Sequence, residues 1–220
     1  MLKKMLPMAF AMAFSLSAAA DEADIRKQME AKLGTKVESV TKSGYLGLYE
    51  VYADGNIFYT DEKMSAIVVS GQLIDAKTMK NVTDERMKKL TAIKFGDLPL
   101  DRAIKQVRGD GKRVLATFED PNCGYCKRLE KDLLAIKDVA IYTFLLPVLG
   151  PDSNAKSKDI WCAKDGAKVW RSWMVDGMAP PKSAEKCDAA VLERNLAMGR
   201  KYRVNGTPAL VFEDGTRAPG

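Results

Sequence analysis

The residues best suited to chemistry are two cysteines in the run Cys123-Gly124-Tyr125-Cys126. The run follows a predicted strand and opens a predicted helix. Free N–H groups and the dipole at a helix N-terminus stabilise an anion, which lowers the pKa of a thiol at that position. We therefore expect Cys123 to be the exposed thiolate that attacks a disulfide. Cys126 lies one turn further along the same face and, as the resolving thiol, would release the attacked partner.

Two other roles are open to this cysteine pair. The first is a structural disulfide between Cys123 and Cys126, although a bridge over so short a loop is strained. The second is a zinc site, but zinc needs another close pair of ligands, and Cys162 and Cys187 lie 25 residues apart. We therefore predict no metal site and no cofactor. Cys162 and Cys187 fit a structural bridge instead, and closing such a loop contributes roughly 3 kcal/mol.

The composition excludes several other kinds of chemistry. The 220 residues include no histidine, which rules out Ser-His-Asp catalysis, Cys-His catalysis and histidine-ligated zinc. The net charge is +6, but the basic residues are dispersed among acidic ones, so we do not expect nucleic-acid binding. A hydrophobic fraction of 46% with 29% charged residues is typical of a globular protein. Thiol–disulfide exchange needs no imidazole, so it remains open.

Residues 1–20 have the composition of a signal peptide. Lys3 and Lys4 form a positive start, residues 5–16 are apolar, and three small alanines end at Ala20. A membrane anchor is the alternative, but it needs about 20 apolar residues. We expect cleavage after about Ala20. Export would place the cysteines in a compartment where disulfides persist.

The elements that follow the signal peptide form a small helix-and-sheet region. Asp24 can cap a short helix that ends at Gly34, and residues 36–75 then alternate as strands do, with a hairpin turn at Asp54-Gly55. The core of so short a region is marginal, and pairing with a second copy would relieve that. The predicted strands cover residues 46–53, 56–60, 66–70 and 72–75.

A helix over residues 81–97 would connect this region to the rest of the chain. Thr83 starts it and Gly96 ends it, so that about 13 helical residues make a strut of roughly 20 Å. A core helix of either neighbouring domain is the alternative.

The C-terminal part alternates helix and strand, which predicts an α/β arrangement with a mixed sheet. Gly206-Thr207-Pro208 precedes its last strand, and the residues alone favour an ordinary trans proline there. The predicted helices are 101–108, 122–136, 153–176 and 188–202, and the predicted strands are 113–118, 139–146 and 209–212 with a short final run after residue 215.

Four motifs occur in the order known from one protein family, and on them the chain resembles the bacterial periplasmic thiol:disulfide isomerases of the DsbC/DsbG family. The resemblance implies an α+β / α/β chain with three parts after the signal peptide. These are an N-terminal cystatin-like dimerisation domain at 21–80, a linker helix at 81–97 and a thioredoxin-like domain with a helical insertion at 98–220. The motifs are Asn81-Val82-Thr83, Phe118-Glu119-Asp120-Pro121-Asn122-Cys123-Gly124-Tyr125-Cys126, Ile160-Trp161-Cys162-Ala163-Lys164-Asp165 and Val204-Asn205-Gly206-Thr207-Pro208-Ala209.

The resemblance also implies a function. It implies a V-shaped periplasmic homodimer that rearranges incorrect disulfides in misfolded exported proteins, with chaperone activity in an apolar cleft. Cys123 would attack, Cys126 would resolve, and a membrane reductant of the DsbD type would keep both reduced. A cis Thr207-Pro208 bond would face Cys123, and Cys162–Cys187 would be the structural disulfide. The substrate-binding residues so implied are Gly124, Tyr125, Thr207 and Pro208.

Two rival functions remain open, a dithiol oxidase that donates disulfides and a non-enzymatic dimeric holdase. The chain also departs from its relatives in two places. Lys127 stands where some family members carry a histidine, and the chain stops at Gly220, where thioredoxin-like domains continue into another helix, so we expect a truncated sequence. For Asp120, three residues before Cys123, we expect a helix-capping role.

Overall fold

The computed structural model describes residues 13–184 and 186–219, and the chain divides into two compact units, Met1–Met87 and Lys88–Gly220. Most of the predicted signal peptide lies outside the described residues. No helix within the described ranges is both long enough and apolar enough to cross a membrane.

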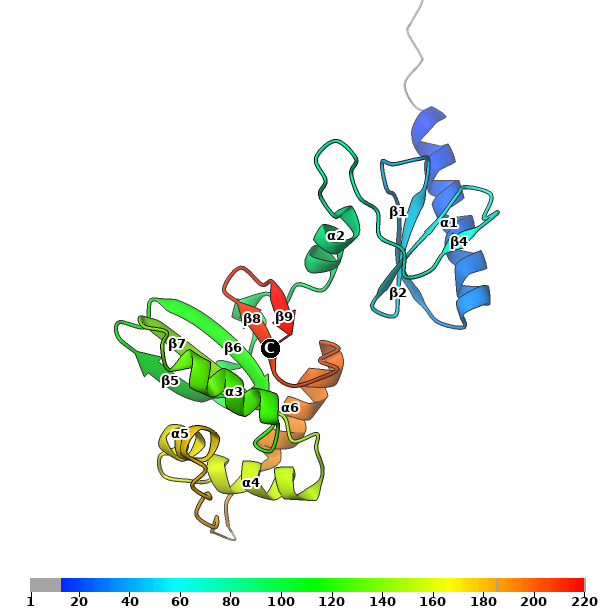
Figure 1. Ribbon diagram of the computed structural model, residues 1–220. Helices are drawn as coiled ribbons and strands as arrows, with labels where there is room; N and C mark the ends of the chain where they lie inside the picture. The colour runs from blue at the N-terminus through cyan, green and yellow to red at the C-terminus, as the bar shows by residue number, and fades with distance from the viewer. Residues whose placement is uncertain (1–12, 185, 220) are drawn as a thin grey trace, which may run out of the picture. The chain divides into compact units, whose positions relative to one another are not determined.

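The N-terminal unit packs one helix on an antiparallel sheet (Figure 1). Helix α1 buries Ile25 and Met29 against Val37 and Val51 of the sheet. The helix ends before Gly34, whose φ of +66° suits glycine, but it does not begin at Asp24 as predicted. The elements are α1 (Ala13–Leu33), β1 (Val37–Lys42), β2 (Tyr49–Ala53), β3 (Asn56–Thr60) and β4 (Ile67–Val68), and the strand order is β1-β2-β3-β4.

The predicted hairpin at Asp54-Gly55 joins β2 to β3 in antiparallel register. Both turn residues have positive φ, 47° and 77°, as a tight two-residue turn requires. The strand predicted at 72–75 is wrong, because only an isolated bridge pairs Ile74 with Asn81 there.

Helix α2 (Val82–Leu90) is shorter than the predicted helix over 81–97. Its first turns are tied to the N-terminal sheet: the Tyr59 and Thr83 hydroxyls lie 2.7 Å apart, and Arg86 pairs with the buried Glu50 through bonds of 2.8 to 3.0 Å. Beyond Leu90 the chain leaves the helix because Ile93 is buried in the C-terminal unit, where its N–H donates to the Gly215 carbonyl at 2.9 Å.

The C-terminal unit is built on a five-stranded mixed sheet of order β5-β7-β6-β8-β9. Strands β6 and β7 are parallel and the other pairs are antiparallel, which confirms the predicted mixed sheet. The strands are β5 (Ile104–Arg108), β6 (Arg113–Glu119), β7 (Val139–Leu145), β8 (Ala209–Phe212) and β9 (Arg217–Pro219).

The helix predicted over 101–108 is wrong. A short 3-10 turn (Leu100–Arg102) leads instead into edge strand β5, in which Ile104 and Gln106 are buried and Val107 is 55% exposed. Apolar spacing over so few residues fits either period, and pairing with β7 selects the strand.

Helices cover both faces of this sheet (Figure 1). Leu133 of α3 packs on Leu115 and Ile141, while Met198 of α6 packs in the cluster of Phe118 and Phe144 on the opposite face. The helical stretch predicted over 153–176 forms two helices rather than one. The helices of this unit are α3 (Gly124–Leu133), α4 (Pro151–Trp161), α5 (Gly166–Asp176) and α6 (Ala190–Lys201).

Candidate active site

The two central cysteines lie at the N-terminus of α3, directly after β6. Cys123 is the N-cap residue, and its sulfur accepts a hydrogen bond from the Cys126 N–H at 3.3 Å. Both thiols are free. Cys123 is only 5% exposed, and Cys126 is fully buried, so the expectation of an exposed Cys123 is wrong.

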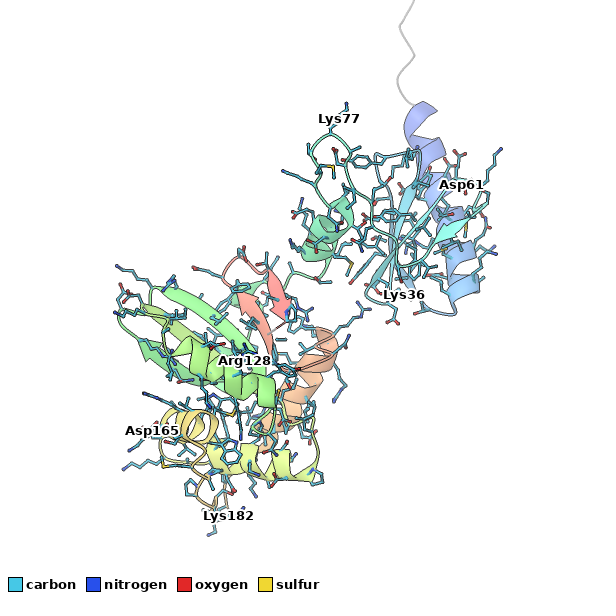
Figure 2. All side chains as sticks on the ribbon, viewed as in Figure 1. Lys36, Asp61, Lys77, Arg128, Asp165 and Lys182 are labelled. Atoms are coloured by element: carbon cyan, nitrogen blue, oxygen red, sulfur yellow. A yellow bond between two sulfur atoms is a disulfide. The ribbon has the colours of Figure 1, made fainter. Side chains whose placement is uncertain are left out.

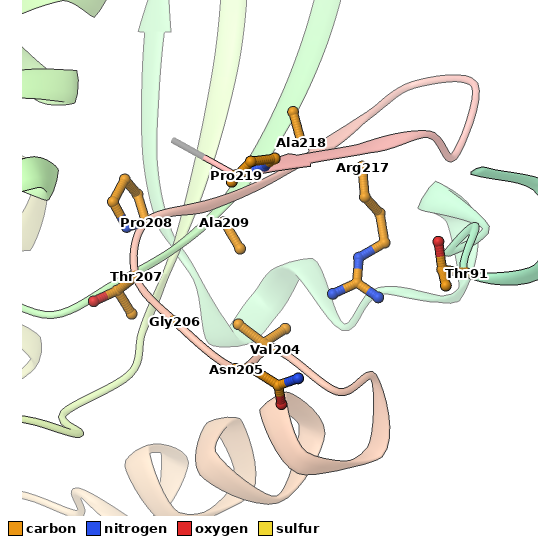
Figure 3. A pocket seen from close by; sticks show the side chains of 10 residues that line it. All are labelled: Thr91, Val204, Asn205, Gly206, Thr207, Pro208, Ala209, Arg217, Ala218 and Pro219. Carbon is orange, nitrogen blue, oxygen red and sulfur yellow. The ribbon is translucent and has the colours of Figure 1, made fainter. Parts of the chain in front are cut away.

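The loop between α6 and β8 partly covers Cys123. The Thr207–Pro208 peptide bond is cis, and the Cys123 thiol donates to the Thr207 carbonyl at 3.2 Å. Thr207 and Pro208, together with Val204, Arg217 and neighbouring residues, also line a hollow of about 450 Å³ (Figure 3). Residues more than 80 positions apart in sequence therefore meet at one sulfur atom.

The two thiols have opposite electrostatic surroundings. Burial acts to raise the pKa of Cys123, but hydrogen bonds from the Thr207 side chain, from Cys126 and from the Tyr125 backbone outweigh it and hold that pKa below the ordinary thiol value. Burial, and then the negative charge of Glu119, raise the pKa of Cys126 far above that value. Cys123 is therefore suited to attack as a thiolate, and Cys126 is held as a protonated thiol.

Asp120 organises the loop in front of Cys123, and it does not cap α3 as expected. Its buried carboxylate accepts four hydrogen bonds of 2.7 to 2.9 Å, from the N–H groups of Asn122, Val148 and Leu149 and from the Ser153 hydroxyl. These donors come from three segments, so Asp120 joins the active-site loop to the segment after β7 and to the first turn of α4. Capping is left to Cys123 itself.

Lys127 and Trp173 brace the same loop from α3 and α5. The Trp173 indole N–H donates to the Pro121 carbonyl at 2.6 Å, and the Lys127 ammonium lies 3.9 Å from the centre of the Trp173 ring. Lys127 thus contacts an aromatic ring beside the cysteine pair.

Two buried acids near Cys126 were not singled out from the sequence. Glu119 ends β6 and Glu130 lies on α3, and both are fully buried. Burial, and then the charge of Glu130, raise the pKa of Glu119 well above its ordinary value. The available signal is an acidic residue at the end of the buried strand β6. By contrast, the charged side chains of Arg128, Asp165 and Lys182 are exposed (Figure 2).

The remaining predicted site residues lie around this centre. Gly124 and Tyr125 are exposed at the start of α3, with Tyr125 at 71%. Cys162 and Cys187 form a disulfide with a Cα–Cα distance of 5.9 Å, which joins the end of α4 to the segment before α6. Within the described residues, no group of three or more cysteine, aspartate or glutamate side chains could hold a metal ion.

Comparison with known proteins gives matches over both units. Residues 100–220 match the family described as a thioredoxin-like domain, and residues 16–84 match the disulfide bond isomerase protein N-terminal domain. These matches confirm the predicted fold class.

Individual relatives agree with the family matches. The chain is 52% identical to the probable thiol:disulfide interchange protein DsbC of Bordetella parapertussis over 187 residues, which are 85% of this chain and 65% of that protein. It is 31% identical to thiol:disulfide interchange protein DsbC of Escherichia coli K12, over 94% of this chain and 86% of that one. A crystal structure of a disulfide interchange protein from Neisseria gonorrhoeae aligns with a TM-score of 0.53 at 41% identity, over 56% of this chain and 88% of that chain. The chain therefore spans about two thirds of the length of its Bordetella relative.

Proposed function

The chain belongs to the DsbC family of thiol:disulfide interchange proteins, and on that premise we propose that it is a disulfide isomerase and reductase acting on exported proteins. The observation that carries this proposal is the asymmetry of the cysteine pair. Against the effect of burial, hydrogen bonds from the Thr207 side chain, Cys126 and Tyr125 lower the pKa of Cys123, while burial raises the pKa of Cys126. One thiol is therefore prepared to attack and the other is held in reserve.

The proposed reaction is thiol–disulfide exchange. The Cys123 thiolate attacks one sulfur of an incorrect client disulfide, a mixed disulfide forms, and the other client sulfur leaves as a thiolate. That thiolate attacks a different disulfide of the client, and a final exchange returns Cys123 as a thiolate, so that the client is isomerised without net oxidation. If rearrangement stalls, Cys126 attacks the Cys123 sulfur, which releases the client reduced and leaves a Cys123–Cys126 disulfide.

We assign client binding to the residues around Cys123. The backbone of Thr207 and Pro208 lies beside the sulfur and is suited to hold an extended client segment there. Gly124 leaves the approach open, and the exposed Tyr125 ring offers apolar contact to a partly folded client. The exposed side chains of Val148 and Leu149 would extend this apolar contact and support a chaperone activity.

We further propose a periplasmic homodimer joined through residues 21–80. The match of residues 16–84 to an isomerase N-terminal domain supports this, as does the small four-stranded sheet with two edge strands. The proposed domain boundaries place the linker at 81–97 and the catalytic domain at 98–220. A signal peptide cleaved after about Ala20 and a membrane reductant of the DsbD type complete the proposal.

The test is reactivation of ribonuclease that carries scrambled disulfides, measured with the purified full chain. We expect reactivation by the wild-type protein and none above background by Cys123→Ser. Full activity in Cys123→Ser would overturn the proposal. A wild-type protein that oxidises reduced ribonuclease but does not reactivate the scrambled form would be a dithiol oxidase, and one that only suppresses aggregation, before and after alkylation, would be a holdase.

A further inference from the structure

Basic side chains around the cysteine pair have no part in the exchange reaction as written above. Lys127 and Arg128 lie on the first two turns of α3. Lys127 follows Cys123 by four positions, and its N–H donates to the Cys123 carbonyl at 3.1 Å. Arg128 is exposed (Figure 2). It follows Tyr125 by three positions, so it lies next to the side chain that we assign to client binding. A client that reaches Cys123 therefore meets both cations.

The Trp173 ring holds two ammonium groups beside the active-site loop. Its indole N–H donates to the Pro121 carbonyl at 2.6 Å, which fixes the ring against that loop. The ammonium of Lys127 lies 3.9 Å from the centre of the ring, and that of Lys156 on α4 lies 5.0 Å from it. Both lysines are only partly exposed. Cations held in this way lose less conformational freedom on binding an anion than mobile surface lysines do.

Asp152 is an exposed acid on the same surface. It lies in the first turn of α4, forms an ion pair with Lys156 and accepts from the Asn122 side-chain amide at 2.8 Å. Hydrogen bonds from Lys156 and then Asn122 hold the pKa of Asp152 below its ordinary value, so Asp152 is ionised and compensates the charge of Lys156. Neither Lys127 nor Arg128 forms an ion pair with an acid of the described residues.

The neighbouring loops do not compensate these two charges. Residues 146–150, which Asp120 joins to the active-site loop, include no ionisable side chain, and neither do residues 204–209. The acids nearest the cysteine pair are buried: Asp120 is enclosed by its four donors, and Glu119 and Glu130 are fully buried. The charge that a client meets on this surface is therefore positive.

We propose that Lys127, Arg128 and Lys156 form a cationic rim that selects client disulfides with aspartate or glutamate beside the cysteine. The proposal rests on the proposed function and names its class of substrate. The Cys123 thiolate is itself an anion, so without the rim it would repel an acidic segment. With the rim, an acidic segment is attracted and a basic segment is repelled, so that acidic client segments are attacked faster.

The rim acts on the approach of the client and leaves the covalent step unchanged. The Cys123 thiolate forms a bond to one client sulfur, the client disulfide breaks, and the other sulfur leaves with the electron pair as a thiolate. The step needs no further reactant. Because salt screens attraction over a distance, the preference should be large at low ionic strength and small at high ionic strength.

The test uses three disulfide-linked tripeptides that differ only in the residues on both sides of the cysteine, which are glutamate, glutamine or lysine. The full chain carries Cys126→Ser, so that the mixed disulfide with Cys123 accumulates and mass spectrometry measures its rate of formation. Each rate is divided by the rate of the same peptide with 2-mercaptoethanol, which removes differences in intrinsic reactivity. At low salt the glutamate peptide should react about tenfold faster than the lysine peptide, with the glutamine peptide between them.

Variants of the rim should change the rates in opposite directions. Lys127→Gln/Arg128→Gln should slow the glutamate peptide about fivefold and leave the glutamine peptide within about twofold. Asp152→Asn should speed the glutamate peptide about twofold, because Lys156 is then uncompensated. The asparagine oxygen can still accept from Asn122, so the loop keeps this contact. A purely structural role of these residues would not produce a faster reaction.

A matched control removes the same charge elsewhere. Lys137 is exposed and lies between α3 and β7. The start of β7 pairs with the start of β6, whereas the cysteines follow the end of β6, so Lys137 lies at the far end of the sheet. Lys137→Gln should therefore leave all three rates unchanged. Raising the salt from about 0.01 M to about 1 M shortens the screening length from about 30 Å to about 3 Å and should remove most of the preference.

Equal slowing of all three peptides by Lys127→Gln/Arg128→Gln, or an unchanged order of their rates, would overturn the proposal. If the double variant does not fold, Arg128→Gln and the salt dependence of the intact rim decide the question. None of these measurements uses a misfolded protein. A wild-type chain that does not reactivate scrambled ribonuclease, in a protein whose Cys126→Ser form prefers the glutamate peptide, would therefore refute the proposed function alone.

Discussion

The two cysteine pairs of the C-terminal unit lie in opposite kinds of surroundings. Cys123 and Cys126 are free, buried at a helix N-terminus and enclosed by a carbonyl, several N–H groups and buried acids. Cys162 and Cys187 are joined to each other, partly exposed, and connect the end of α4 to the segment before α6. One domain therefore uses one cysteine pair for reactivity and the other as a structural bridge.

The difference shows what makes a cysteine reactive in this fold. The fold brings the two cysteines of each pair close together, but only the first pair lies where hydrogen bonds lower the pKa of one thiol and burial raises that of the other. The reactivity of a cysteine thus depends on the surroundings of its sulfur atom. The stabilisation of the folded state by a disulfide depends on the length of chain that the bridge closes. Each prediction below changes one side of this contrast.

The largest effect should be the difference in alkylation between Cys123 and Cys126. Because the pKa of Cys123 is lowered, its rate of reaction with iodoacetamide should rise with pH to a plateau. The pH at half of the maximal rate should lie below about 8.5, the value for a free thiol. Cys126 in the Cys123→Ser variant should stay unmodified over the same pH range, since burial and the charge of Glu119 keep it protonated. Mass spectrometry of the modified protein measures both rates, and equal reactivity would break the contrast.

The next effect concerns the Cys162–Cys187 disulfide. The double variant Cys162→Ser/Cys187→Ser should lose roughly 3 kcal/mol in the free energy of unfolding, because the unfolded chain regains the freedom of a long loop. Urea unfolding followed by tryptophan fluorescence measures this loss, with the Cys123→Ser/Cys126→Ser variant as the matched control. While the variant without the Cys162–Cys187 disulfide remains folded, Cys123 should attack a small aromatic disulfide such as Ellman's reagent at an unchanged rate. Loss of this reaction would show that the two pairs are coupled.

A third prediction concerns the loop that carries Cys123. The Asp120 carboxylate accepts four hydrogen bonds on two oxygens, whereas an asparagine offers only one oxygen. In Asp120→Asn the new NH2 group would also face N–H groups, to which it cannot donate. We expect a loss of about 2–3 kcal/mol in the free energy of unfolding and slower attack by Cys123, since the loop loses its link to Val148 and Leu149. Asp132→Asn, at an exposed position of α3, is the matched control and should change little.

How far the sequence predicts this molecule depends on the range of the interactions. Features that depend on neighbouring residues are predicted correctly: the turn at Asp54-Gly55 joins two strands, and the strand predicted at 209–212 coincides with β8. The helix predicted over 101–108 is wrong because the apolar spacing there suits helix and strand alike, and pairing with β7 decides between them. The helix over 81–97 was predicted too long for a similar reason, since burial of Ile93 in the C-terminal unit ends it early.

The candidate site follows the same rule. The run at 123–126 announces thiol chemistry because its effect depends on a helix N-terminus formed by its own neighbours. Contacts with Thr207, Trp170 and Gln106 are set by the packing of remote segments, so neither the low exposure of Cys123 nor the enclosure of Glu130 could be derived from spacing. The position of Asp120 predicts a capping role, whereas its hydrogen-bond donors lie up to 33 residues away.

The smallest effect should come from Lys127, the cation beside the reactive pair. Its ammonium lies over the Trp173 ring, and the indole N–H of Trp173 donates to the Pro121 carbonyl. The Lys127 ammonium therefore contacts the loop only indirectly, through Trp173. For Lys127→Gln we expect a loss of about 0.5–1 kcal/mol in the free energy of unfolding, which is the range of an exposed cation–π contact. Lys156→Gln, whose ammonium lies 5.0 Å from the same ring, is the matched control. The alkylation midpoint of Cys123 should stay nearly constant in both variants, because hydrogen bonds from Thr207, Cys126 and Tyr125 already lower that pKa against the effect of burial. A large rise in the midpoint for Lys127→Gln alone would instead make the lysine charge part of what activates the thiol.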